Sequence, residues 1–169
     1  MDKLKRIKLL LLDVDGVLTD GHITYNDNGS ETKVFHARDG LGLKLLMDAG
    51  IQVGIVTGRT SEAMVHRCKN LGITLIFDQV RDKAKALEHV MDQTKMLADE
   101  IAFIGDDLPD LPIMRRVGLP IAVRDAHEIV VGSSEIVTSA KGGAGAVREI
   151  CEAILKAKGL WGETINQYS

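Results

Sequence analysis

An apolar run that ends in two aspartates, close to the amino terminus, most strongly constrains the fold. Leu9–Leu12 are four consecutive leucines, and Asp13, Val14 and Asp15 follow them directly. The run is too short to span a membrane, and its unbroken apolar character is typical of a strand buried on both faces of a parallel sheet. Ligands bind at the carboxyl ends of such strands, because the loops there border an open crevice. We therefore expect both aspartates in a ligand-binding crevice.

The spacing of the two aspartates indicates a bound cation. Side chains two positions apart in an extended chain point to the same side, so Asp13 and Asp15 are expected to project together. Two neighbouring carboxylates repel each other unless a cation or a shared proton compensates them. Gly16 then allows the backbone to turn sharply. The stretch predicts a divalent metal site.

Composition and charge limit the possible functions. The chain has 169 residues, 45% of them hydrophobic, which predicts a single domain over residues 1–169. The formal charge of −3 gives no electrostatic reason to expect nucleic acid or an anionic membrane as a partner. No secretory or membrane-length apolar stretch is found, so a cytoplasmic location is expected. Cys68 and Cys151 have apolar neighbours at helical spacing and are expected to be reduced core thiols.

Strand and helix patterns alternate after the first strand, which predicts an α/β fold with a doubly wound parallel sheet. Further strands are expected at residues 51–56, 73–77, 101–104, 119–123 and 135–137. The last two are expected to be short edge strands, because Pro120 argues against a central position.

Two segments lie outside this alternation. β-rich runs flank an Asn-Gly pair at Asn28, which predicts a protruding hairpin over residues 22–34, beside the two aspartates. The tail, residues 160–169, has no periodicity and holds the only tryptophan, Trp161. It is expected either to fold against its own domain or to contact a neighbouring subunit.

Polar side chains follow four of the predicted strands at one edge of the sheet. They are Asp13 and Asp15, Thr57, Lys83, and Asp106 with Asp110. Each one alone has an ordinary structural explanation, such as a turn, a strand exit or a helix cap. Together and in this order they predict phosphoryl transfer through an aspartyl-phosphate.

This chemistry gives each aspartate a role. Asp13 is the predicted nucleophile, while Asp15 protonates the leaving alkoxide and then accepts a proton from the attacking water. Mg²⁺ held by Asp13, Asp106 and the backbone carbonyl of Asp15 would offset the negative charge of the phosphate.

The remaining polar residues are expected to support the transferring group and the metal. Thr57 offers a hydroxyl and Lys83 a positive charge to the phosphoryl oxygens. Asp107 and Asp110 are expected behind the metal, where Asp110 can bond Lys83 or a metal-bound water.

The motifs Asp-x-Asp-Gly-x-x-Thr, Thr-Gly, Lys and Gly-Asp-Asp-x-x-Asp resemble, in this order, the four motifs of the haloacid dehalogenase (HAD) superfamily. They begin at Asp13, Thr57, Lys83 and Gly105. Members usually carry a cap domain between the first and second motifs or between the second and third. Here the first interval has room only for a hairpin and a helix, and the second only for a helix and a strand. The resemblance implies a Rossmann-like HAD core with no cap domain and Mg²⁺ as cofactor.

Four further stretches, residues 13–21, 35–42, 57–59 and 142–149, resemble a capless branch of that superfamily. Its members hydrolyse an eight-carbon sugar acid 8-phosphate, a small molecule of lipopolysaccharide precursor synthesis. The resemblance implies a homotetramer, in which the hairpin helps to build the oligomer and the tail reaches an adjacent active site. The implied substrate contacts are Asp15, His36, Arg38, Asp39, Gly40, Gly58, Arg59, Arg67 and Lys83.

Two alternatives remain open from the sequence. A related branch that acts on nine-carbon keto acid 9-phosphates has Glu where Arg59 stands, so Arg59 favours the eight-carbon acid. A signalling receiver domain also places an Asp nucleophile, Mg²⁺, a Thr and a Lys on a doubly wound sheet. In receivers the phosphorylated Asp follows an earlier acidic pair and has no acid two residues later. Asp15 therefore favours an enzyme.

Overall fold

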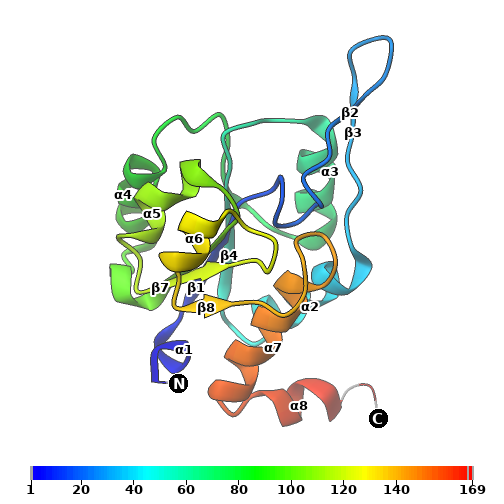
Figure 1. Cartoon of the computed structure of the whole chain (residues 1–169). Helices are drawn as coiled ribbons and strands as arrows, with labels where there is room; N and C mark the ends of the chain where they lie inside the picture. Colours follow the sequence, from blue (N-terminus) through cyan, green and yellow to red (C-terminus); the bar gives the residue numbers. More distant parts are fainter. Residues whose placement is uncertain (1, 167, 169) are drawn as a thin grey trace.

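A six-stranded parallel sheet forms the centre of the structure (Figure 1). The computed structural model describes residues 2–166 and 168. The strand order is β5-β4-β1-β6-β7-β8, and every neighbouring pair is parallel. The strands are β1 (Leu9–Leu12), β4 (Gln52–Val56), β5 (Leu75–Phe77), β6 (Ile101–Gly105), β7 (Leu119–Ala122) and β8 (Ile136–Val137). The predicted doubly wound parallel sheet is confirmed.

Helices cover both faces of the sheet, with α2, α3 and α7 on one face and α4, α5 and α6 on the other. The helices are α1 (Asp2–Arg6), α2 (Ala37–Asp48), α3 (Glu62–Leu71), α4 (Lys83–Thr94), α5 (Leu111–Met114), α6 (Glu128–Gly132), α7 (Ala146–Ala157) and α8 (Trp161–Asn166), with 3₁₀ turns at Ala98–Glu100 and Leu108–Asp110. In β1, Leu10 and Leu12 pack into the first core and Leu9 and Leu11 into the second. The apolar run is therefore unbroken because both faces of β1 are covered.

The position of β1 determines where a ligand can bind. β1 pairs with β4 on one side and β6 on the other, and the chain winds outward from it in both directions. The carboxyl ends of β1, β4 and β6 thus border the point where the strand order reverses, which is the usual ligand-binding position in such sheets.

The prediction that residues 119–123 form an edge strand is wrong. β7 lies between β6 and β8, so of the two predicted edge strands only β8 is at an edge of the sheet. The Pro120 carbonyl accepts a hydrogen bond from the Glu135 N–H (2.9 Å), on the β8 side. The N–H and C=O of one strand residue point to the same side of the strand. An N–H at position 120 would therefore point toward residues that precede the two-residue strand β8. No ladder hydrogen bond is lost there.

The predicted hairpin is present and projects from the carboxyl edge of the sheet (Figure 1). Its strands, β2 (Thr24–Tyr25) and β3 (Glu31–Thr32), are antiparallel and shorter than the sequence suggested. Between them the Asn26 N–H donates to the Ser30 carbonyl (2.9 Å). Residues 13–83, all of which the structure describes, contain no inserted cap domain.

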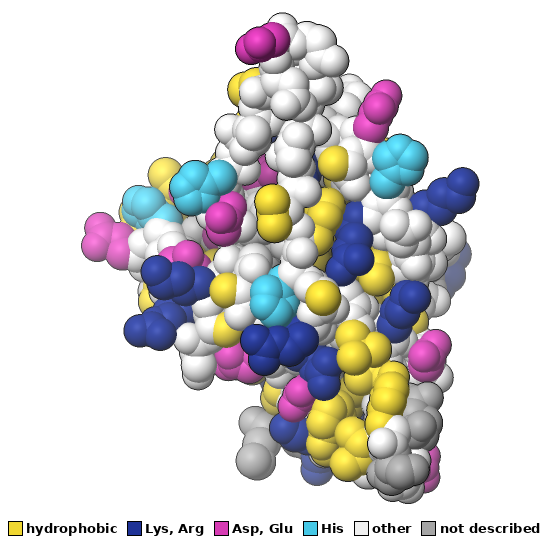
Figure 2. All heavy atoms as spheres, turned by 90° about the vertical axis from the view of Figure 1, so that its right-hand side faces the viewer, with side chains coloured by type: hydrophobic (Ala, Val, Ile, Leu, Met, Phe, Trp, Pro, Cys, Tyr) yellow, Lys and Arg dark blue, Asp and Glu magenta, His cyan; other side chains and the backbone are white. Residues whose placement is uncertain are grey.

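The tail is more ordered than its sequence suggested. Residues 161–166 form helix α8, and the ring of Trp161 lies 5.9 Å from the Arg148 guanidinium and 5.1 Å from the Lys156 ammonium, both on α7. Figure 2 shows hydrophobic side chains gathered toward this end of the molecule. Trp161 therefore packs on its own chain here, while residues 167 and 169 lie outside the described residues.

Both cysteines are buried and free, as predicted. Cys68 is on α3 and Cys151 on α7. Burial raises the pKa of the Cys68 thiol to about 11, so it remains protonated at neutral pH. Within the described residues, no helix combines the length and apolar character needed to cross a membrane.

Candidate active site

Asp13 and Lys83 form the centre of the site. Asp13 directly follows β1, and its N–H donates to the Ile104 carbonyl of β6 (3.1 Å). Its Oδ1 lies 3.0 Å from Nζ of Lys83, the first residue of α4. Asp82 begins this helix, because its carboxylate accepts the Ala84 N–H (3.0 Å). The Lys83 side chain is only 4% exposed, so its charge depends on the carboxylates around it.

Three carboxylates converge beside Lys83. Each of Asp13, Asp106 and Asp110 offers an oxygen, and these oxygens all lie within 4.8 Å of one another. Burial, together with the charge of Asp13 and other neighbouring aspartates, raises the pKa of Asp106 to about 8. Burial also raises the pKa of Asp13 to about 6, although Lys83 opposes the change. One buried ammonium does not balance three carboxylates, of which Asp110 is buried and Asp13 and Asp106 are half-buried, so the donor set fits a divalent cation with oxygen ligands.

Asp110 supports the site from behind. Its Oδ1 pairs with Lys83, and its Oδ2 accepts the N–H groups of Asp106 (2.9 Å) and Asp107 (3.3 Å). Both oxygens are therefore already engaged, which leaves Asp13 and Asp106 as the carboxylates available to a metal. Asp107 accepts the Leu108 N–H (2.8 Å) and caps the turn that contains Asp110.

Gly16 makes room for Asp106. Its φ is +91°, and a Cβ placed on it would lie 1.9 Å from Oδ2 of Asp106. The Asp106 carboxylate thus lies directly against the Gly16 backbone. This position requires glycine both for its conformation and for the close approach.

The side chain of Asp15 turns toward the hairpin. Its Oδ1 lies 2.5 Å from Lys33 Nζ, and its Oδ2 lies 3.6 Å from Arg59 Nε. Arg59 also pairs with Glu31 and donates to the Tyr25 hydroxyl (3.2 Å). Sequence reasoning missed Lys33, Glu31 and Tyr25. A usable signal was present, because residues two apart on a strand share a face and Glu31 and Lys33 are spaced that way.

Thr57 follows β4 and is held by its backbone. Its N–H donates to the Phe77 carbonyl (2.9 Å), and its carbonyl accepts the Val80 N–H (3.0 Å). The residue is 2% exposed. Its Oγ1 accepts the Arg59 N–H at 3.4 Å.

A cavity of about 310 Å³ joins these strand ends. It is lined by Asp13, Asp15, Gly21, Thr57, Gly58, Arg59, Val80, Arg81, Lys83, Asp106, Asp107, Pro109 and Asp110. Every predicted catalytic and metal-binding residue is in this set. Arg81 is also in it and was not predicted, because it lies in a loop and belongs to no motif.

Five of the predicted substrate contacts do not line this cavity: His36, Arg38, Asp39, Gly40 and Arg67. Asp39 is 1% exposed and accepts the Arg148 N–H (2.8 Å) and the Gly145 N–H (3.4 Å). It therefore joins α2 to the start of α7, where a carboxylate is favoured by the helix dipole. Burial raises its pKa despite these hydrogen bonds.

Arg67, His36 and Gly40 form a separate cluster. Arg67 donates to the His36 carbonyl (3.3 Å), and its guanidinium lies 5.7 Å from the Phe35 ring. A Cβ on Gly40 would lie 2.2 Å from Arg67 Nη2, so glycine is needed there for this packing. Arg38 is exposed on α2.

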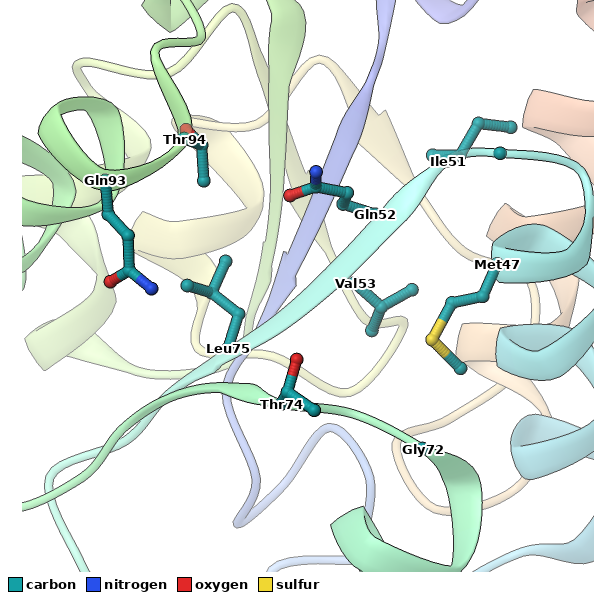
Figure 3. A pocket seen from close by; sticks show the side chains of 10 residues that line it. Met47, Ile51, Gln52, Val53, Gly72, Thr74, Leu75, Gln93 and Thr94 are labelled. Carbon is teal, nitrogen blue, oxygen red and sulfur yellow. The ribbon is translucent and has the colours of Figure 1, made fainter.

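A second cavity, of about 560 Å³, lies at the amino ends of β4 and β5 (Figure 3). It is lined by Met47, Gly50, Ile51, Gln52, Val53, Gly72, Thr74, Leu75, Gln93 and Thr94. None of these residues is charged, so the cavity offers no cationic side chain to a phosphate.

Comparisons with known proteins identify relatives over the whole chain. The family profile of haloacid dehalogenase-like hydrolases matches residues 75–150. The 3-deoxy-D-manno-octulosonate 8-phosphate phosphatase of Escherichia coli K12 is 41% identical over 98% of this chain and 88% of its own length. The corresponding Yersinia pestis protein is 43% identical over 90% of this chain and 81% of its own length.

Solved structures of similar proteins point to the same group of relatives. The chain is similar to 3-deoxy-D-manno-octulosonate 8-phosphate phosphatase from Moraxella catarrhalis in complex with magnesium, phosphate and KDO. The identity is 43%, the TM-score is 0.97, and 99% of this chain and 97% of that chain are covered. The cobalt-bound phosphatase of Haemophilus influenzae is 45% identical, with a TM-score of 0.92 and coverage of 94% and 93%.

Proposed function

Because the chain belongs to the 3-deoxy-D-manno-octulosonate 8-phosphate phosphatases of the haloacid dehalogenase superfamily, we propose that it hydrolyses this sugar acid phosphate in lipopolysaccharide precursor synthesis. The products are the free sugar acid and phosphate. The observation that carries the proposal is the pairing of Asp13 with buried Lys83 beside Asp106, at one cavity. A nucleophile, a charge for the phosphoryl oxygens and a metal ligand meet there.

Asp13 and Asp15 have different roles in the two displacements at phosphorus, which form and then hydrolyse the aspartyl-phosphate. Asp13 attacks phosphorus, and the departing alkoxide takes a proton from Asp15, which leaves an aspartyl-phosphate on Asp13. Asp15 then accepts a proton from a water molecule as that water attacks phosphorus. Phosphate is released and the Asp13 carboxylate is restored.

The other residues of the site bind the phosphoryl group or the metal and offset the negative charge of the phosphate. Lys83 and the Thr57 hydroxyl contact the phosphoryl oxygens, and Gly58 and Arg59 line the same cavity. Asp13 and Asp106 would hold Mg²⁺, with the Asp15 carbonyl as a further ligand. The bound ion supplies positive charge that offsets the repulsion between Asp13 and the phosphate.

We also propose a cytoplasmic homotetramer with no nucleic acid or membrane partner. Exposed apolar residues on the hairpin support assembly, since Tyr25 is 62% and Val34 77% exposed. The family resemblance implies further substrate contacts, and we propose that they act in such an assembly. They are His36, Arg38, Asp39, Gly40 and Arg67.

A substrate panel tests the function. With Mg²⁺, phosphate release is expected to show its highest kcat/KM for the eight-carbon sugar acid 8-phosphate. A nine-carbon keto acid 9-phosphate and a hexose 6-phosphate, which has no carboxylate, serve as comparisons. Chelation with EDTA should abolish turnover, and added Mg²⁺ should restore it. Preference for the nine-carbon acid would support the alternative branch, and a single stoichiometric labelling without turnover would support a receiver domain.

Arg81 is expected to bind the carboxylate of the substrate. It is exposed and lines the cavity together with Arg59. Arg81→Ala should raise KM for the sugar acid phosphate about tenfold, the effect of losing one charge-assisted contact of about 1.4 kcal/mol. KM for hexose 6-phosphate, which lacks the carboxylate, should change little. Exposed Arg115, outside the cavity, provides the matched control Arg115→Ala. Equal KM values for Arg81→Ala and wild type would exclude this role.

A further inference from the structure

The side chain of Lys33 is buried although the residue lies in an exposed part of the chain. It follows β3 on the returning arm of the hairpin, between Thr32 and Val34, which are both exposed. Its own side chain is 3% exposed. Burial of an ammonium is costly unless carboxylates pair with it, so this placement needs specific partners.

Those partners are Asp15 and Glu31. Lys33 Nζ lies 2.5 Å from Asp15 Oδ1 and 3.5 Å from Glu31 Oε2. Glu31 Oε2 is buried and accepts no hydrogen bond from the described residues; Lys33 faces this oxygen, whereas Arg59 pairs with the other oxygen, Oε1. The ammonium is therefore held between a hairpin carboxylate and the aspartate that follows β1.

The two catalytic aspartates are held by different lysines. Lys83 fixes Asp13 from the sheet side, whereas Lys33 contacts one Asp15 oxygen from the hairpin. The other Asp15 oxygen faces Arg59, which itself pairs with Glu31 of the hairpin. The orientation of the Asp15 carboxylate is thus set by groups that belong to or contact the hairpin.

We propose that Lys33 is a positioning residue, which holds the Asp15 carboxylate in the orientation needed for proton transfer to the leaving group. The inference rests on the role proposed for Asp15. Proton transfer requires the carboxylate to lie within about 3 Å of the leaving oxygen. Without Lys33, Asp15 Oδ1 would lose its paired ammonium, and the cation that Asp15 shares with Glu31 Oε2 would no longer hold the two carboxylates against their mutual repulsion.

The dependence on leaving group tests the proposal. An alkoxide needs a proton as it departs, whereas p-nitrophenolate leaves readily without one. Lys33→Met should lower kcat for the sugar acid phosphate about 30-fold or more, since general acid catalysis typically contributes 10²- to 10⁴-fold. The burst of p-nitrophenol from p-nitrophenyl phosphate, which reports formation of the phosphoenzyme alone, should fall less than about threefold. Lys33→Arg should recover most of the loss.

Two controls separate positioning from a general structural role. Lys44→Met removes the same charge from an exposed position on α2 and should match wild type. In an Asp15→Asn background, Lys33→Met should cause no further loss of kcat, because the two residues act together. Equal losses on both substrates, or a further loss in the Asp15→Asn background, would overturn the proposal. Failure of wild type to turn over either substrate would instead overturn the proposed function.

Discussion

Asp13→Asn is expected to lower phosphate release by at least about 10⁴-fold with the fold intact, as is usual when a catalytic nucleophile is removed. An amide cannot form the aspartyl-phosphate, and no described carboxylate other than Asp13 both follows β1 and pairs with Lys83. Rapid quenching followed by intact-protein mass spectrometry should detect the phosphorylated form in wild type and not in the variant. Asp48→Asn, at an exposed position on α2, provides the control. Appreciable turnover by Asp13→Asn prepared free of wild type would refute the nucleophile assignment.

The same variant has an expected effect on stability in EDTA. Burial raises the pKa of Asp13 to about 6, above its ordinary value of 3.8. Ionised Asp13 therefore costs folding free energy, and this cost grows as pH rises from about 4 to about 6. Asn carries no charge, so Asp13→Asn should be more stable relative to wild type at pH 7 than at pH 4. Thermal melts at the two pH values measure this difference.

Residues at the ends of buried strands could be predicted from the sequence. Asp13, Thr57 and Asp106 each follow an apolar run, and parallel strands bring their carboxyl ends to one edge of the sheet. The register of the sheet then leaves little freedom in where these side chains lie. Lys83 could be predicted because Asp82 is a recognisable helix cap.

Residues placed by loops could not be predicted in the same way. Arg81 precedes α4 in a loop, and Lys33 reaches the site because the hairpin folds back toward Asp15. The position of Arg81 follows from no periodicity, and the spacing of Glu31 and Lys33 indicates that they share a face but not that this face meets Asp15. Asp39 was predicted to contact the substrate because it lies in a motif-like stretch. In the structure its carboxylate accepts a hydrogen bond from the N-terminus of α7 instead. Its role depends on how two helices pack, which local sequence does not specify.

Gly16→Ala is expected to lower kcat/KM by about 10³-fold, comparable to loss of a metal ligand, because it displaces Asp106. The added Cβ would lie 1.9 Å from Asp106 Oδ2, and the φ of +91° is unfavourable for alanine by about 1 to 2 kcal/mol. The backbone between Asp13 and the hairpin cannot move away freely, because the Gly142 backbone packs against the Gly16 carbonyl. The contact is so close that a Cβ added to Gly142 would lie 1.7 Å from the Gly16 oxygen. The Asp106 carboxylate must therefore rotate out of the metal site.

Magnesium titration distinguishes this effect from simple destabilisation. Gly16→Ala should need a much higher Mg²⁺ concentration for half-maximal activity. Mg²⁺ should also raise its Tm less than that of wild type, because a ligand that binds only the folded state stabilises it less when it binds more weakly. Gly29→Ala, at the open turn of the hairpin, carries a similar positive φ of +82° with nothing within 4 Å of the added Cβ. It should lose only the stability that the positive φ costs alanine and should keep its Mg²⁺ dependence. If Gly16→Ala instead binds Mg²⁺ as wild type does, the Asp106 carboxylate is not the group that the glycine serves, and the assignment of Asp106 as a ligand is wrong.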